Sequence, residues 1–126
     1  MSLYDTRFFF EHYYSDDPST LKKTGNELSS KRPRYVSVMT IHELYKLILE
    51  KEGRDVAELR IRLATKDFEV IPMDEELAVP SAEIRSKHLI PMADSVIAAT
   101  AKLYHLECVS DDPHFAQIRE IKTRWI

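Results

Sequence analysis

Short apolar runs alternate with longer stretches of helical period along this chain. The apolar runs lie at residues 2–5, 34–38, 68–71 and 106–110, with a weaker one at 122–126. The helical stretches fall between them, at about residues 8–14, 18–30, 41–51, 56–65, 75–87 and 91–104. Such alternation is typical of parallel strands joined by crossover helices. We therefore predict an α/β fold around a parallel sheet of four or five strands.

The helical stretch at residues 91–104 differs from the others in its many small side chains. Ala93, Ala98, Ala99 and Ala101 accompany larger apolar residues there. A helix of this composition can pack closely on a sheet, so we predict that it is a central crossover. In the stretch at 41–51, apolar residues recur at steps of three and four, which indicates one buried face.

Composition narrows the class of protein. A chain of 126 residues predicts one domain, spanning residues 1–126. No apolar run approaches the roughly 20 residues of a membrane helix, and no secretion signal is recognisable at the N-terminus. The single cysteine, Cys108, cannot form an internal disulfide, and its apolar neighbours predict burial in the core. These features favour a cytoplasmic protein with no membrane partner.

Glycine is scarce, with only Gly25 and Gly53 in the chain. Phosphate-binding loops of the Walker or dinucleotide type need several glycines, so neither can be built here. The net charge of −3 argues mildly against a protein that holds nucleic acid by bulk electrostatics. That argument weakens if bound divalent cations reverse the local sign of the charge.

Four acidic residues, far apart in sequence, are predicted to meet at one edge of the sheet. Asp5 ends the first apolar run, and Asp112 follows the run at 106–110. Glu43 and Asp94 each lie in the first turn of a predicted helix. Carboxyl ends of parallel strands and the starts of the following helices share one edge, where ligands of open α/β sheets bind.

Each acid also has an ordinary structural explanation. Residues 40–43, which include Glu43, match a capping box, and Asp112 before Pro113 matches an N-cap. Asp94 would be stabilised by the positive end of a helix dipole, and Asp5 is a residue type common in turns. Four converging carboxylates, however, repel one another unless a cation neutralises them. Oxygen ligands favour Mg²⁺ or Mn²⁺, so we predict a carboxylate site for one of these ions.

These residues together resemble the PIN-domain family, and by length the VapC-like toxins of prokaryotic toxin–antitoxin pairs. The resemblance runs through nearly the whole chain, in the expected order and spacing. It rests on Tyr4-Asp5-Thr6, on Glu43, and on two segments, PMADSVIAAT at residues 91–100 and VSDDPHF at 109–115.

The resemblance implies a three-layer α/β/α sandwich that acts as a metal-dependent endoribonuclease. Asp5, Glu43, Asp94 and Asp112 would be the catalytic residues and the ligands of Mg²⁺ or Mn²⁺. Thr6 and Ser110 would assist by hydrogen bonds. The resemblance further implies an RNA substrate, a small antitoxin partner and a homodimer.

Two positions depart from the family pattern. Arg7 stands where many relatives carry a small polar residue; it would contact an RNA phosphate or an acid of the pocket, or simply be exposed. Asp111 beside Asp112 leaves the fourth ligand ambiguous, and the spacing to Phe115 favours Asp112. His114, near the pocket rim, is expected to be a surface residue of the following helix.

The means of holding RNA stay open. The basic stretch at residues 31–34 either contacts phosphates or is a solvated loop, and a strand beginning at Arg34 would place it at the edge opposite the acids. The aromatic residues at 8–14 either stack bases or, more in keeping with their spread around the helix, are buried.

Alternative functions also remain open. A phosphatase with an aspartate nucleophile needs D-x-D after the first strand, whereas Asp5 is followed by Thr6 and Arg7. Receiver domains pair two acids early in the chain, whereas the adjacent pair here comes late. Further alternatives are a housekeeping RNA-processing nuclease and a non-catalytic PIN-like binding module.

Overall fold

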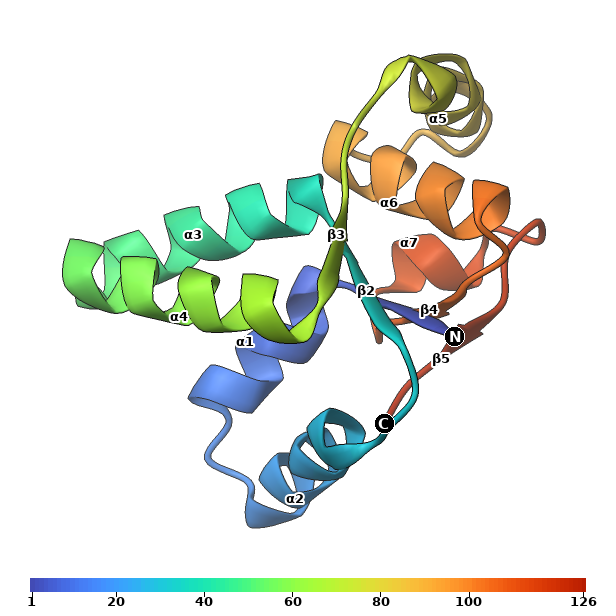
Figure 1. Ribbon diagram of the computed structural model, residues 1–126. Coiled ribbons are helices and arrows are strands. Elements are labelled where there is room, and N and C mark those ends of the chain that lie inside the picture. The colour runs from blue at the N-terminus through green and yellow to red at the C-terminus, as the bar shows by residue number, and fades with distance from the viewer.

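A computed structural model describes residues 1–126, and its centre is one parallel sheet of five strands (Figure 1). The strands are β1 (Ser2–Tyr4), β2 (Arg34–Ser37), β3 (Glu69–Ile71), β4 (Glu107–Val109) and β5 (Thr123–Arg124). Their order across the sheet is β3-β2-β1-β4-β5, and every neighbouring pair is parallel. The predicted fold class is confirmed, with five strands.

Seven helices cover the two faces of the sheet. They are α1 (Thr6–Tyr14), α2 (Pro18–Ser29), α3 (Val38–Glu52), α4 (Arg54–Asp67), α5 (Glu75–His88), α6 (Met92–Leu103) and α7 (Pro113–Ala116). Figure 1 shows α1, α3 and α4 on one side of the strands and α5, α6 and α7 on the other. The molecule thus has the three layers that the sequence predicted.

The two faces of the sheet each support a separate hydrophobic core. Because side chains alternate along a strand, Leu3 and Cys108 face one core while Tyr4 and Val109 face the other. The first core contains residues of α5, α6 and α7, and the second contains residues of α1, α3 and α4. Cys108 is a buried free thiol, as expected.

Helix α6 is the central crossover that its small side chains predicted. Every residue from Asp94 to Ala101 is buried. The alanines let the helix approach both the sheet and α5 closely, and this brings the first turn of α6 against the sheet edge.

Helix α3 begins earlier than predicted, and this moves Glu43 within the helix. The Ser37 side chain accepts a hydrogen bond from the backbone N–H of Met39, so Ser37 is the N-cap. The predicted capping box at residues 40–43 is therefore wrong: Glu43 lies in the second turn, and the buried Thr40 hydroxyl has no hydrogen-bond partner.

The aromatic residues of α1 mainly build the core. Phe8 and Phe9 are buried in the second core, and Tyr13 and Tyr14 pack against it. The Phe9 and Phe68 ring centroids are 5.0 Å apart, which joins α1 to the residue preceding β3.

None of the seven helices is both long and apolar enough to span a bilayer.

Candidate active site

The order in which the chain adds strands to the sheet reverses between β1 and β4. The predicted acids gather at the carboxyl ends of these two strands. The connections from β1 lead outward to β2 and β3, after which the chain returns to β4 on the other side of β1. Open α/β sheets bind ligands at such a switch point. Asp5 directly follows β1, and its backbone N–H donates to the Val109 carbonyl at 3.2 Å, which continues the pairing of β1 with β4.

Asp5 is the most deeply buried of the acids, with 3% of its surface exposed. The Ser110 hydroxyl donates a hydrogen bond to Asp5 Oδ2 at 2.7 Å. The pKa of Asp5 is raised to about 7: burial is the largest cause, hydrogen bonds from Ser110 and Thr6 oppose it, and the charges of Asp94 and Glu43 add to it. A carboxylate in this position is costly unless a positive charge lies beside it.

Glu43 extends from the second turn of α3 toward the same edge. The Thr6 hydroxyl donates to Glu43 Oε1 at 2.8 Å, so the start of α1 holds the glutamate in place. Burial raises the pKa of the Glu43 carboxyl, and the charges of Asp94 and Asp112 act in the same direction. Glu43 is thus electrostatically linked to acids from α6 and from the start of α7.

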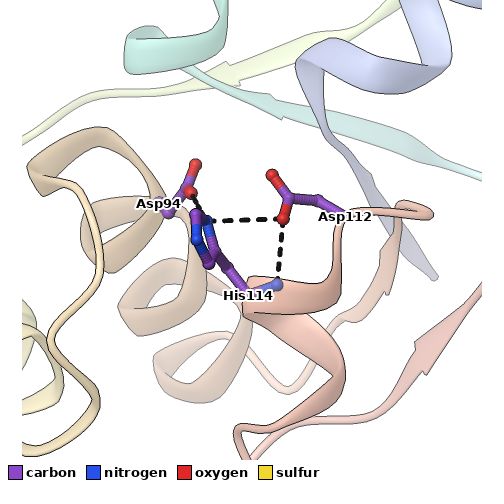
Figure 2. Close-up of side chains that lie close together, drawn as sticks. All are labelled: Asp94, Asp112 and His114. Carbon is purple, nitrogen blue, oxygen red and sulfur yellow. Dashed lines mark hydrogen bonds and ion pairs between the residues drawn. The ribbon is translucent and has the colours of Figure 1, made fainter.

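Asp94, Asp112 and His114 form the tightest group of candidate ligands, with one ligand atom of each within 4.8 Å of the others. Figure 2 shows the His114 ring between the two carboxylates. His114 Nδ1 lies 2.7 Å from Asp94 Oδ2 and 3.4 Å from Asp112 Oδ1. The hydrogen bond to Asp94 raises the pKa of His114, while burial raises the pKa of Asp94.

The contact of His114 with Asp94 and Asp112 corrects the sequence-based expectation that His114 is only a surface residue. Asp112 is the N-cap of α7 and accepts from the His114 backbone N–H at 2.9 Å, with Pro113 at the first helical position. This cap turns the histidine back toward the acids. The sequence Asp112-Pro113-His114 carries the signal for a capped helix start, which places the backbone of His114 but does not give the direction of its imidazole.

Asp111 points to a different partner from Asp112. Arg7 Nε lies 2.9 Å from Asp111 Oδ1, and Arg7 Nη2 lies 2.8 Å from Glu11 Oε1. Arg7 therefore contacts an acid, as one of its alternatives proposed. The acid is Asp111, which is adjacent in sequence to the pocket residue Asp112. Asp111 is thereby occupied, while Asp112 faces Asp94 and His114 (Figure 2).

The assembled side chains offer carboxylate oxygens, two hydroxyl groups and one imidazole at a single sheet edge. Asp5 and Glu43 lie outside the tight group that contains His114. The charge of Asp94 nevertheless raises the pKa of both carboxyls. Most of these donors are hard oxygens, which are suited to Mg²⁺ or Mn²⁺.

A comparison with known families gives the class of domain to which the chain belongs. The model of the PIN domain matches residues 3–121, which is nearly the whole chain. The chain belongs to the PIN-domain family. The matched residues include every acid of the candidate site, so the resemblance seen in the sequence is confirmed at the level of the family. No curated protein sequence matches this PIN domain.

Solved structures share the fold of this PIN domain. One from Rickettsia felis, VapBC2 bound to a DNA fragment from its promoter, has a TM-score of 0.81 at 13% identity, covering 99% of this chain and 98% of that one. A toxin–antitoxin complex from Klebsiella pneumoniae has a TM-score of 0.76 at 24% identity, with coverages of 96% and 95%. VapC20 from Mycobacterium tuberculosis, described as a sarcin–ricin loop cleaving toxin, has a TM-score of 0.74 at 18% identity, with coverages of 97% and 99%.

Proposed function

We propose that residues 1–126 form one domain that acts as a metal-dependent endoribonuclease, the toxin of a toxin–antitoxin pair. The observation that carries this proposal is the burial of Asp5, with its raised pKa of about 7, beside Glu43 and Asp94. Gathering acids that repel one another lowers the stability of the folded state, so folding alone gives no reason for this arrangement. A divalent cation would turn that repulsion into binding energy.

The proposed ligands of Mg²⁺ or Mn²⁺ are Asp5, Glu43, Asp94 and Asp112. When bound, the ion would acidify the attacking water, polarise the phosphoryl oxygens and stabilise the leaving oxygen of a phosphodiester. The hydroxyl groups of Thr6 and Ser110 donate to Glu43 and Asp5, which fixes the directions of these two carboxylates. Orientation of ligands by such outer hydrogen bonds is typical of metal sites.

A carboxylate oxygen is also needed to accept the proton of the attacking water. Asp112 Oδ1 accepts from the His114 backbone and Asp94 Oδ2 contacts the His114 ring, so the second oxygen of each carboxylate lacks these contacts. We assign proton acceptance to one of these two oxygens, on Asp94 or Asp112. The raised pKa of Asp94 makes its carboxylate a better proton acceptor than an ordinary aspartate.

RNA would approach along a hollow beside Glu43. The lining of this hollow includes Thr6 from α1, His42, Glu43 and Lys46 from α3, and Ala93 from α6. The exposed Lys46 ammonium, which lies 2.9 Å from Glu50 Oε1, would attract a phosphate in exchange for this exposed pairing. The basic stretch at residues 31–34 is less suitable, because Arg34 begins β2 and so lies at the sheet edge opposite the acids.

The partners follow from the structural relatives. The one from Klebsiella pneumoniae is described as a toxin–antitoxin complex, and the one from Rickettsia felis as VapBC2 bound to a DNA fragment from its promoter. We infer a small antitoxin that binds this chain, a homodimeric toxin, and a cytoplasmic location where RNA is accessible. A housekeeping RNA-processing nuclease and a non-catalytic PIN-like binding module are the alternatives.

Anomalous diffraction from crystals soaked in Mn²⁺ tests the metal site without knowledge of the RNA target. We expect a peak within ligand distance of Asp5, Asp94 and Asp112, with Glu43 close by. Cleavage of total cellular RNA with Mn²⁺, lost in Asp94→Asn, would then establish the nuclease. The absence of any peak from an open, ordered site would favour the binding module. Growth arrest on expression, relieved by a co-expressed neighbouring gene product, separates toxin from housekeeping enzyme.

A further inference from the structure

We propose that the His114 imidazole supplies a nitrogen ligand to the cation site, and that this ligand makes the site prefer Mn²⁺, Co²⁺ and Ni²⁺ over Mg²⁺. The inference rests on the proposed function, since it concerns the metal assigned there to the carboxylates. It adds a residue of different chemistry to an all-oxygen ligand set.

The first support is geometric. His114 Nδ1 lies 2.7 Å from Asp94 Oδ2 and 3.4 Å from Asp112 Oδ1. Neighbouring ligand atoms of a six-coordinate ion with bonds of about 2.1 Å are separated by about 3 Å. Both observed separations are close to this value, so one ion can contact the nitrogen and both carboxylates after small side-chain adjustments.

The second support is the way in which the ring is held. The backbone N–H of His114 donates to Asp112 Oδ1 at 2.9 Å, and Phe115 anchors the same short helix in the core with none of its surface exposed. The His114 side chain itself is 42% exposed, so ions and water can reach it. A ring placed by a capped and anchored helix needs little reordering to bind an ion.

The third support is ligand chemistry. Mg²⁺ strongly favours oxygen ligands and gains little from an imidazole. Imidazole nitrogen suits the first-row transition metals, whose affinities rise from Mn²⁺ through Co²⁺ to Ni²⁺. The hydrogen bond to Asp94 and coordination would use the same nitrogen, so they are alternative states of one side chain. The hydrogen bond holds the ring beside the acids until an ion takes the place of the proton.

The test is isothermal titration of protein without a polyhistidine tag, using Mg²⁺, Mn²⁺ and Ni²⁺ in turn. In His114→Ala we expect the Ni²⁺ affinity to fall about tenfold or more, Mn²⁺ to fall less, and Mg²⁺ to change by less than about twofold. The matched control is His105→Asn. His105 follows α6 and precedes β4, far from the acids along the strand direction, and asparagine tolerates its backbone φ of 54°.

A spectroscopic measurement identifies the ligand atom directly and does not rely on a change in affinity. Electron spin-echo spectra of bound Mn²⁺ should contain modulation from a directly bound ¹⁴N, absent in His114→Gln. Ions that bind without this modulation, together with equal affinity losses for all three metals in His114→Ala, would overturn the assignment of His114 and leave the carboxylate site intact. Failure of the unaltered chain to bind any of the metals would overturn both proposals.

Discussion

The guanidinium of Arg7 binds the carboxylate of Asp111 through two hydrogen bonds, Nε to Oδ1 at 2.9 Å and Nη2 to Oδ2 at 3.2 Å. The pair joins the first turn of α1 to the loop after β4, across 104 positions of sequence. Both side chains are more than a third exposed, so the pair contributes about 1 kcal/mol at most to stability. Its main consequence is that the two adjacent carboxylates point to different partners. Asp111 points toward Arg7, and Asp112 points toward His114.

We therefore predict opposite behaviour for two adjacent amide substitutions. Asp112→Asn should weaken Mn²⁺ binding about tenfold or more, because a charged ligand is lost. Asparagine caps a helix as well as aspartate does, so the melting temperature without metal should hardly change. Asp111→Asn should leave Mn²⁺ binding within about twofold. Calorimetric titration of the two variants measures the difference, and a larger loss in Asp111→Asn would make Asp111 the ligand.

The raised pKa of Asp5 predicts an unusual dependence of stability on pH in metal-free protein. The folded-state pKa is about 7, against an ordinary value of 3.8. Between these values the folded state holds a proton that the unfolded state has released, so the free energy of unfolding falls as pH rises from about 4 to about 7. A shift of this size corresponds to on the order of 4 kcal/mol. Urea unfolding in chelator at pH 5 and pH 8 measures the part of this change that falls above pH 5, on the order of 3 kcal/mol.

The control for this pH effect is a comparison of two Asp→Asn variants. Asp5→Asn removes the ionisable group and should flatten the pH dependence, whereas Asp16→Asn, at an exposed position, should leave it unchanged. Adding Mn²⁺ should stabilise the unaltered protein more at pH 8 than at pH 5, because metal ligands must be deprotonated. Equal slopes in the unaltered protein and in Asp5→Asn would show that other groups cause the dependence.

The strands and helices could be predicted because their signals are local. All five strands and six of the seven helices lie where apolar runs and helical periods placed them, with ends shifted by a few residues. The largest shift is at the start of α3, where the N-cap is Ser37 and not Thr40. Sequence alone could not rank them, since burial of Thr40 depends on the packed core.

The site could be predicted only in part. Parallel topology requires residues after β1 and β4 to share an edge, so the meeting of Asp5 and Asp112 follows from the strand pattern. Contacts such as Arg7 with Asp111, or His114 with Asp94, depend on side-chain directions across elements far apart in sequence. No periodicity encodes those directions, and they emerge only from the packed tertiary structure. The assignment of the acids as ligands stays a prediction.

Ser110 holds two parts of the site at once, so its removal should be costly. Its hydroxyl donates to Asp5 Oδ2 at 2.7 Å and accepts from the Asp112 backbone N–H at 3.0 Å. Ser110→Ala leaves a buried carboxylate oxygen without its donor, and we expect a loss of about 1–3 kcal/mol in the free energy of unfolding. Denaturant unfolding of the metal-free variant at pH 8 measures this loss.

Ser110→Thr keeps the hydroxyl and is the matched control. It should retain most of the stability and the Mn²⁺ affinity, whereas Ser110→Ala should lose both. A loss in Ser110→Ala confined to stability, with Mn²⁺ affinity unchanged, would show that the hydroxyl does not orient the proposed ligands.

A second polar network, on the face of the sheet that carries α1 and α2, ties both ends of the chain together. Arg124 of β5 donates from Nη1 to Glu27 Oε1 at 2.6 Å and from Nε to Glu107 Oε1 at 2.7 Å. The Tyr4 hydroxyl donates to Glu27 Oε2 at 2.6 Å, and burial, followed by the contact with Glu27, raises the pKa of Tyr4 to about 12. One guanidinium thus joins β5, β4 and α2.

Arg124→Ala should lower the free energy of unfolding by about 1–3 kcal/mol, because hydrogen bonds to charged groups are lost and Glu27 keeps only its contact with Tyr4. Arg124→Lys should not restore the loss, since an ammonium cannot reproduce the forked geometry. Arg54→Ala, which breaks the exposed pair with Glu58, is the control and should have little effect. Denaturant unfolding measures all three variants.

Amide hydrogen exchange distinguishes loss of this network from damage to the site. In Arg124→Ala, exchange should accelerate in α2 and β5, because these two elements are held to the sheet through the missing guanidinium. Mn²⁺ affinity should stay unchanged, since the acids lie beyond the carboxyl ends of β1 and β4 and share no hydrogen bond with Arg124. Reduced Mn²⁺ affinity in this variant would show that β5 supports the site through β4, and that the two networks are one energetic unit.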